Sequence, residues 1–178
     1  VLTDFLEFAR PKPPNFIPTD LNQTLRRSVH LANLPSLNPH LLVELDLEGT
    51  LPELEADPEQ CAQAFLNLIL NAAQAMPEGG LIQISTRLMD TSESQKQIVV
   101  EVMDQGIGMS EETRNKIFNP FFTTKDMGTG LGLSIVHRIV DNHQARIEVE
   151  SRPGKGSTFR ILFPLNTAIS ATPGGVKG

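Results

Sequence analysis

Three short stretches carry groups that could hold a charged ligand. Asn67 and Asn71 lie four residues apart in a segment with helical periodicity, so both amides leave the same helix face. Residues 104–109 read DQGIGM after an apolar stretch, and residues 128–133 read GTGLGL at the start of another helical segment. Neutral amide oxygens suit Mg²⁺, and glycine-rich backbone at a helix start offers N–H groups to phosphates. In this order, the three stretches indicate a site for a nucleotide with Mg²⁺.

Each stretch has a plainer explanation when it is taken alone. Two asparagines on one helix face could simply face solvent, and an acid with two glycines after a strand could be an ordinary hairpin turn. A dinucleotide fingerprint is disfavoured because Glu111 stands where its third glycine would be. The GTGLGL run is no P-loop, because no Gly-Lys-Ser or Gly-Lys-Thr closes it. A solvent-facing helix, however, has no reason to be followed by the other two stretches in this order.

The stretches, together with GKGSTF at residues 154–159, resemble the sequence boxes of the ATP-binding catalytic domain of sensor histidine kinases. These kinases belong to the gyrase, chaperone, histidine kinase and MutL ATPase superfamily. The resemblance runs from about Thr19 to Leu165 and is most specific over residues 67–159. It implies an α/β two-layer sandwich of the Bergerat type, in which a mixed sheet of about five strands is covered by three helices. It also implies ATP and Mg²⁺ as ligands.

The resemblance assigns roles to single residues. Asn71 would hold Mg²⁺, and Asn67, the expected catalytic residue, would lie beside the phosphates. Asp104 would accept a hydrogen bond from the adenine amine and would reject the carbonyl of guanine, because an ionised carboxylate only accepts. Thr158 would support Asp104, and Lys125 would meet phosphate oxygens. The complete expected set is Asn67, Asn71, Gln74, Asp104, Gly106, Gly108, Met109, Lys125, Gly128, Thr129, Gly130, Leu131, Gly132, Leu133 and Thr158.

Periodicity predicts the elements that would position these residues. Helices are expected over residues 20–33, 57–76 and 132–141, and strands over residues 41–47, 81–88, 97–103, 146–150 and 158–163. Asp57 and Pro58 are expected to start the second helix as cap and first-turn residue. Residues 109–127 form a long connection and are expected to be a lid between hinges at Gly108 and Gly128. Phe118, Phe121 and Phe122 resemble the aromatic box of the family, which implies that they pack the end of the lid.

Composition narrows the class of protein. The chain has 178 residues, 39% of them hydrophobic, which predicts one ordinary core. Its net charge is −6, and no block of Lys and Arg suggests nucleic acid as a partner. No apolar run reaches the roughly 20 residues of a membrane span, so we expect no direct membrane contact and a cytoplasmic domain. The single cysteine, Cys61, excludes an internal disulfide and is expected in the core.

Three segments are expected along the chain. Residues 1–18 would comprise the end of an upstream helix and a proline-rich linker, residues 19–165 the ATP-binding domain, and residues 166–178 a disordered tail. None of the four histidines, His30, His40, His137 and His143, begins the acceptor pattern of these kinases. The expected partners are therefore an upstream dimerisation and histidine-phosphotransfer domain and a response regulator.

Two alternatives remain at the level of sequence. An ATP hydrolase or an anti-sigma-type serine kinase of the same superfamily resembles this chain, but those relatives place a glutamate where Asn67 stands. A degenerate domain could also bind nucleotide without catalysis, although Asn71, Asp104 and the glycine run are intact. The chain departs from the family at residues 143–145, which read HQA instead of HGG; we expect this to change a turn.

Overall fold

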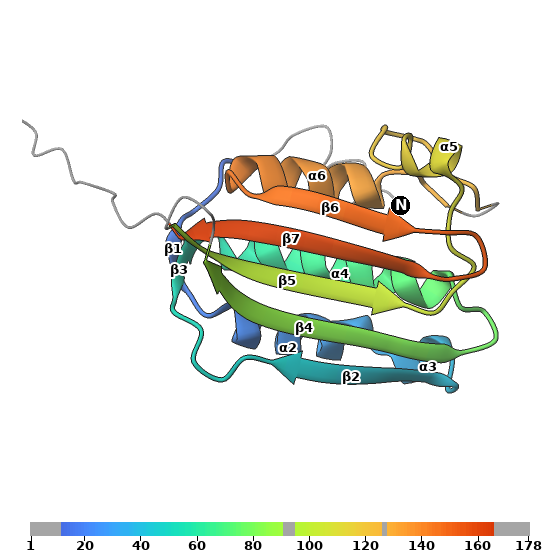
Figure 1. The fold of residues 1–178 in the computed structure, drawn as a ribbon, viewed down its shortest axis with the longest axis horizontal. Coiled ribbons are helices and arrows are strands. Elements are labelled where there is room, and N and C mark those ends of the chain that lie inside the picture. The colour runs from blue at the N-terminus through green and yellow to red at the C-terminus, as the bar shows by residue number, and fades with distance from the viewer. Residues whose placement is uncertain (1–11, 91–94, 126–127, 166–178) are drawn as a thin grey trace, which may run out of the picture.

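A mixed sheet lies in front of three longer helices and forms, with them, two layers (Figure 1). The computed structural model describes residues 12–90, 95–125 and 128–165. In chain order, the elements are β1 (Ile17–Thr19), α2 (Leu21–Ala32), α3 (Leu34–Leu37), β2 (Leu41–Leu47), β3 (Leu54–Ala56), α4 (Pro58–Gln74), β4 (Gly80–Asp90), β5 (Lys96–Asp104), α5 (Glu111–Arg114), α6 (Gly132–Asn142), β6 (Arg146–Ser151) and β7 (Ser157–Leu165). The predicted two-layer α/β sandwich is confirmed.

The main sheet has five strands in the order β2-β4-β5-β7-β6. The β2 and β4 strands pair in parallel, and the other neighbours pair antiparallel, so the predicted mixed sheet is confirmed. In the register of β5 with β7, Asp104 lies opposite Ser157 and Met103 lies opposite Thr158. This register places the end of β5 beside the start of β7.

The helices begin where side chains can cap them. The Asp20 carboxylate accepts a hydrogen bond from the Gln23 N–H, and the Asp57 carboxylate accepts from the N–H groups of Glu59 and Gln60. A carboxylate at this position satisfies N–H groups that have no partner within the helix. The inner faces of α4 and the sheet then form the core, which contains the fully buried residues Phe65, Ile69, Ile84, Val100 and Ile161.

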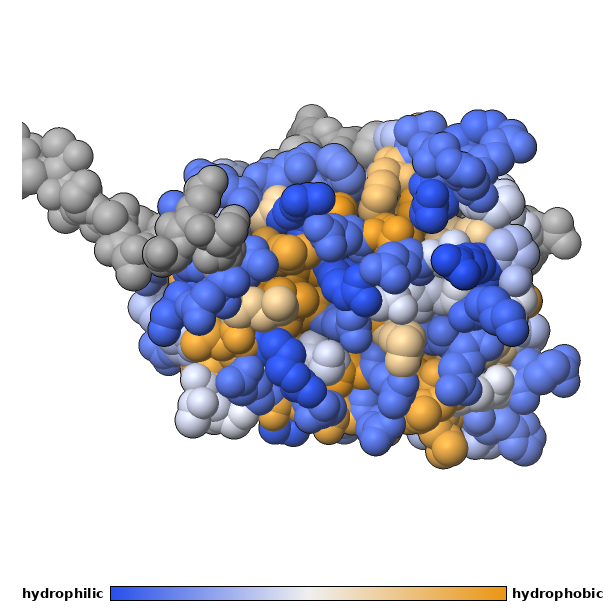
Figure 2. Space-filling view, viewed as in Figure 1, coloured by the Kyte–Doolittle hydropathy of each residue, from blue (hydrophilic) through white to orange (hydrophobic). Residues whose placement is uncertain are grey.

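The other face of the sheet faces the viewer in Figure 2 and mixes polar and apolar side chains. Arg160 forms ion pairs with Glu101 and Glu150 across β5, β7 and β6, and Arg87 pairs with Asp46. Leu42, on β2, has an exposed fraction of 65%. Because only one face of the sheet is covered by helices, strand residues alternate between core and this charged surface.

The structure contains four short elements that the sequence analysis did not predict: β1, β3, α3 and α5. The β1 strand pairs antiparallel with β3 in a separate two-stranded sheet, which includes Ile17 and Pro18 from the segment predicted as linker. The helices α3 and α5 have four residues each, and α5 lies in the segment expected to be a lid without strong helical character. Elements of three or four residues are too short to generate a recognisable hydrophobic period.

Some predictions fall on residues outside the described ranges. These are the end of an upstream helix expected at the start of the chain, the last two residues of the predicted lid, and the tail from residue 166. Within the described ranges, none of the helices combines the length and apolar character that crossing a bilayer requires.

Candidate functional site

A cavity of about 360 Å³ lies between α4, the start of α6 and the segment that follows β5. It brings together most of the residues that the sequence singles out, although they span 67 positions of the chain from Asn67 to Leu133. The predicted residues that line it are Asn67, Asn71, Gln74, Gly108, Met109, Lys125, Gly128, Thr129, Gly130, Gly132 and Leu133. Asp104, Gly106, Leu131 and Thr158 do not line this cavity.

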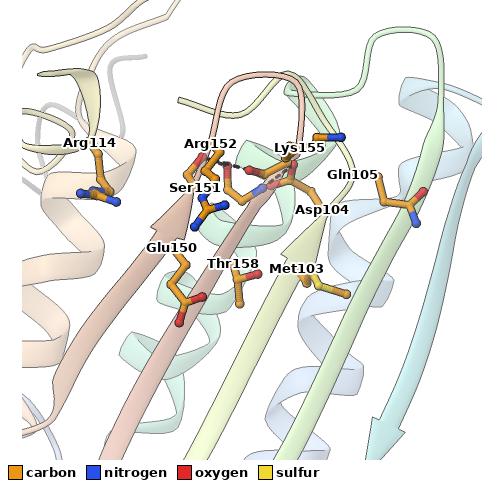
Figure 3. Close-up of a pocket in the computed structure, with 11 residues that line it drawn as sticks. Met103, Asp104, Gln105, Arg114, Glu150, Ser151, Arg152, Lys155 and Thr158 are labelled. Carbon is orange, nitrogen blue, oxygen red and sulfur yellow. Dashed lines mark hydrogen bonds between the residues drawn. The ribbon is translucent and has the colours of Figure 1, made fainter. Parts of the chain in front are cut away.

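Asp104 lies behind the cavity wall, in a second and more open hollow of about 580 Å³ at the ends of β5, β6 and β7 (Figure 3). Only 4% of the residue is exposed, and Ser157 lines both hollows. The carboxylate Oδ1 accepts hydrogen bonds from the N–H of Gly106 at 2.8 Å and from the N–H of Ser157 at 3.3 Å. Both bonds end on Oδ1, which leaves Oδ2 for a further donor.

Burial sets the electrostatics of Asp104. Desolvation raises the pKa of this carboxyl above 3.8, while the two backbone hydrogen bonds and the positive charge of Lys125 oppose the rise. A carboxylate in this setting is costly unless its remaining lone pairs are satisfied. A bound ligand that donates a hydrogen bond to Oδ2 would therefore stabilise the ionised form.

The structure corrects the predicted role of Thr158. Thr158 lies opposite Met103 in the ladder, so its side chain is on the outer face of the sheet, away from the Asp104 carboxylate (Figure 3). Ser157 takes its place through its backbone N–H. Side chains alternate along a strand, so the parity of buried Phe159 could have identified Ser157 as the residue on the inner face.

The glycines after Asp104 are required by close backbone packing. A Cβ on Gly106 would lie 2.5 Å from the carbonyl oxygen of Ala75, and one on Gly108 would lie 2.0 Å from that of Arg152. Gly108 also has φ +64°, which disfavours any side chain. Between them, Ile107 donates its N–H to Ala75 and accepts from the N–H of Gly154. The stretch is thus held by backbone between the end of α4 and the β6–β7 turn.

The amides of α4 face a positive charge. The Lys125 ammonium donates to Oδ1 of Asn71 at 2.9 Å and to Oε1 of Gln74 at 2.7 Å. Burial lowers the pKa of Lys125, and the charge of Asp104 opposes this shift. Asn67, one turn earlier on the same face, donates its amide Nδ2 to the carbonyl of Gly132 at 3.3 Å and so connects α4 to α6.

The start of α6 faces the same cavity without a side-chain cap. Its N-cap residue, Leu131, is buried and makes no capping hydrogen bond through its side chain. Gly132 and Leu133, the first two residues of the helix, both line the cavity. Unpaired N–H groups at the positive end of a helix dipole favour an anion.

Several cavity residues were not predicted. Leu70 of α4 and Ala75, the residue that follows the helix as its C-cap, line the cavity beside the predicted amides, and their spacing of three and four residues from Asn67 and Asn71 could have identified them. Ile117 and Thr123 belong to the segment after β5. That segment has no period from which its inward-facing side chains could be read.

The four histidines lie away from the cavity. His143 is buried: its Nδ1 donates to the carbonyl of Ile139 at 2.8 Å, and its Nε2 accepts from the N–H of Asp57 at 3.0 Å. This pattern fixes a neutral imidazole, and burial lowers the pKa of His143. Beside it, burial raises the pKa of Cys61 to about 12, as expected for a core thiol. Gln144 adopts φ 51° in the turn where the family pattern has glycine.

Comparison with known proteins agrees with this geometry. Residues 56–167 match the family described as Histidine kinase-, DNA gyrase B-, and HSP90-like ATPase. Sensor histidine kinase ZraS of Escherichia coli (strain K12) is 38% identical over 166 residues, which cover 93% of this chain and 35% of ZraS. The chain thus spans about a third of that relative.

Two solved structures extend the comparison. Full-length ShkA in complex with AMPPNP matches with a TM-score of 0.80 and 26% identity, over 94% of this chain and 35% of ShkA. Histidine kinase ThkA in complex with response regulator protein TrrA matches with a TM-score of 0.75 and 30% identity, over 92% of this chain and 46% of that chain. The chain therefore belongs to the histidine kinase-, DNA gyrase B- and HSP90-like ATPase family, as an ATP-binding catalytic domain of the sensor histidine kinase type.

Proposed function

We propose that this domain binds Mg²⁺-ATP in the cavity between α4 and α6 and transfers the γ-phosphoryl group to a histidine on a dimerisation domain, from which a response regulator receives it. One observation carries the proposal most directly. Two amide oxygens of α4 point at one cation, Lys125, and face the uncapped start of α6 across the cavity. This pairs a cation site with an anion site, as a metal-bound polyphosphate requires.

Asp104 would select the base where the two hollows meet, next to Ser157, which lines both of them. Its Oδ1 is occupied by two backbone N–H groups, so Oδ2 would accept the exocyclic amine of adenine. Guanine would present a carbonyl there, and two acceptors would face each other. Gly106 and Gly108 would keep the wall beside the base at a fixed position, because their backbone is packed against Ala75 and Arg152.

The other end of the site would hold the phosphates. The N–H groups of Gly132 and Leu133, together with the glycines before them, would bind phosphate oxygens. The residues present fit Mg²⁺: the Asn71 oxygen already accepts a cationic donor, and Mg²⁺ takes most of its remaining ligands from phosphates and water. When bound, the metal would neutralise phosphate charge. Gln74 would contribute a second neutral oxygen nearby.

The neutral side chain of Asn67 favours transfer of the phosphoryl group to another protein over hydrolysis of ATP. Its amide is neutral, donates to Gly132, and cannot take a proton from water near neutral pH. No histidine lines the cavity, so an acceptor would have to come to it with its own base. A hydrolase or serine kinase of the superfamily is the alternative. It is disfavoured because those relatives have a glutamate where this chain has the neutral Asn67. Because the substrate would be ATP, we expect the domain to act in the cytoplasm.

Loss of metal dependence in an Asn71→Ala variant would test the metal site. ATP affinity is measured by calorimetric titration at increasing Mg²⁺ concentrations. We expect the parent to bind more tightly as Mg²⁺ rises and the variant to respond little. Asn142→Ala is the matched control, because Asn142 lies at the far end of α6 and bonds to Gln60. An unchanged Mg²⁺ response in Asn71→Ala would place the metal ligand elsewhere.

A further inference from the structure

Lys125 makes specific contacts that reach beyond its own segment. Its ammonium bonds to Asn71 at 2.9 Å and to Gln74 at 2.7 Å, both on α4 and both more than 50 positions away in the sequence. An ammonium has only donors, so each amide must present its oxygen to it. Two neutral amides turned in this way define a small cation site, and Lys125 occupies it.

The backbone around Lys125 supports this placement. The Lys125 N–H donates to the hydroxyl oxygen of Thr123 at 3.1 Å, and the Gly128 N–H donates to the Lys125 carbonyl at 3.1 Å. Both flanking residues line the cavity with Lys125. The backbone of Lys125 is therefore held by hydrogen bonds on both of its sides, so the lysine differs from a long side chain that samples solvent.

A divalent metal and this ammonium would compete for the same atom. Mg²⁺ binds oxygen at about 2.0–2.1 Å, so the ammonium cannot stay in hydrogen-bond contact with the Oδ1 of Asn71 once a metal is bound there. Without metal, the same ammonium places a positive charge in the cavity that the start of α6 faces. Phosphates that enter the cavity would then meet a cation already in place.

We propose that Lys125 is the resident cation of the Asn71–Gln74 pair, with two consequences for binding. It competes with divalent metal for Asn71, and it supplies the counter-charge that lets nucleotide bind without metal. The proposal rests on the proposed function, since it concerns nucleotide in the same cavity. It adds that Lys125 determines how strongly binding depends on the metal.

The first test compares ATP affinity with and without metal. Calorimetric titration is carried out in excess Mg²⁺ and in EDTA for the parent, Lys125→Met and Lys116→Met. Lys116 is the matched control, because it belongs to the same segment, loses the same charge and pairs only with exposed Glu112 in the described contacts.

We expect Lys125→Met to weaken binding in EDTA by about tenfold or more, with a much smaller loss in Mg²⁺. Lys116→Met should leave both affinities near those of the parent. An equal loss of affinity in Mg²⁺ and in EDTA would show that Lys125 is an ordinary phosphate contact and would overturn the proposal. No loss in either condition would overturn it too.

The second test needs no nucleotide. Binding of Mn²⁺ alone is followed by water-proton relaxation. We expect Lys125→Met to bind Mn²⁺ more tightly than the parent, and we expect Lys125→Met combined with Asn71→Ala to lose that gain. Equal or absent Mn²⁺ binding in parent and Lys125→Met would overturn the competition. If the parent failed to bind Mg²⁺-ATP, the proposed function would be wrong. The Mn²⁺ measurement would still test whether Lys125 competes with metal for Asn71.

Discussion

The two ends of the candidate site are held by different kinds of contact. The Asp104 carboxylate accepts from two backbone N–H groups. The backbone of Ile107 beside it bonds to Ala75 after α4 and to Gly154 in the β6–β7 turn, and glycines remove the side chains that would collide. Around Asn71, the contacts are made by side chains, and Lys125 lies outside the helices and strands. If nucleotide binds as proposed, the base end would be preformed and the phosphate end would have to exchange contacts on binding.

The largest expected effect tests the rigidity of the base end. In Gly108→Ala, the new Cβ would collide with the Arg152 carbonyl, and φ would remain in the left-handed region. Because the backbone clash and the strained φ act together, we expect the free energy of unfolding to fall by more than about 3 kcal/mol. In Gly128→Ala, φ is outside the left-handed region and the nearest atom is the side-chain hydroxyl of Thr123 at 2.4 Å, so we expect a loss of no more than about 1 kcal/mol. Urea unfolding measures both, and equal losses would refute the contrast.

A smaller effect is expected when only the charge of Asp104 is removed. Asp104→Asn keeps an oxygen for the two backbone donors but turns an N–H₂ toward the adenine amine. We expect ATP binding to weaken by about 1.5–3 kcal/mol, the value of a charge-assisted hydrogen bond. Calorimetric titration measures the loss, and Asp46→Asn on the outer face of the sheet is the control.

The pH dependence of ATP affinity also tests whether Asp104 binds the base. Ligand binding favours the ionised carboxylate, so affinity should fall as pH drops through the pKa of Asp104. Because burial raises this pKa above 3.8, the fall should begin at a higher pH than for an exposed aspartate. Asp104→Asn should lack this decrease. Unchanged affinity in the variant, or the same pH profile as the parent, would show that Asp104 does not bind the base.

The smallest effect concerns local protection. Nucleotide should slow amide hydrogen exchange more over residues 121–125 than over residues 104–108, because the latter are already held by backbone hydrogen bonds. Exchange followed by mass spectrometry, with and without ATP, measures the difference. A change of the same size in both segments would mean that the two ends respond alike.

Much of the fold could be predicted because its elements are long enough to show a period. The α4 helix has a cap, a first-turn proline and apolar positions over 17 residues, and its Asn67 and Asn71 line the cavity as their spacing predicts. The pairing of β1 with β3 could not be predicted, since three residues carry no period. The prediction of Thr158 as the residue beside Asp104 was wrong by one position, because side chains alternate between the two faces at the start of β7.

The contacts of Lys125 show a different limit. The sequence indicates a basic residue near phosphates, but its bonds to Asn71 and Gln74 depend on how an irregular segment folds back on α4. Such contacts arise from tertiary packing, which local propensity does not determine. For the same reason, the sequence does not show that the glycines at 106 and 108 are required by Ala75 and Arg152.

If the proposed function is correct, this domain phosphorylates a histidine and does not hydrolyse ATP by itself. The direct measurement incubates the chain with γ-labelled ATP, alone and with the acceptor-histidine domain added separately. With Asn67 neutral, we predict phosphate release near background in the first case. In the second, label should appear on the added domain, acid-labile and alkali-stable as phosphohistidine is. Rapid phosphate release by the chain alone, abolished by Asn71→Ala, would identify a hydrolase and contradict the account.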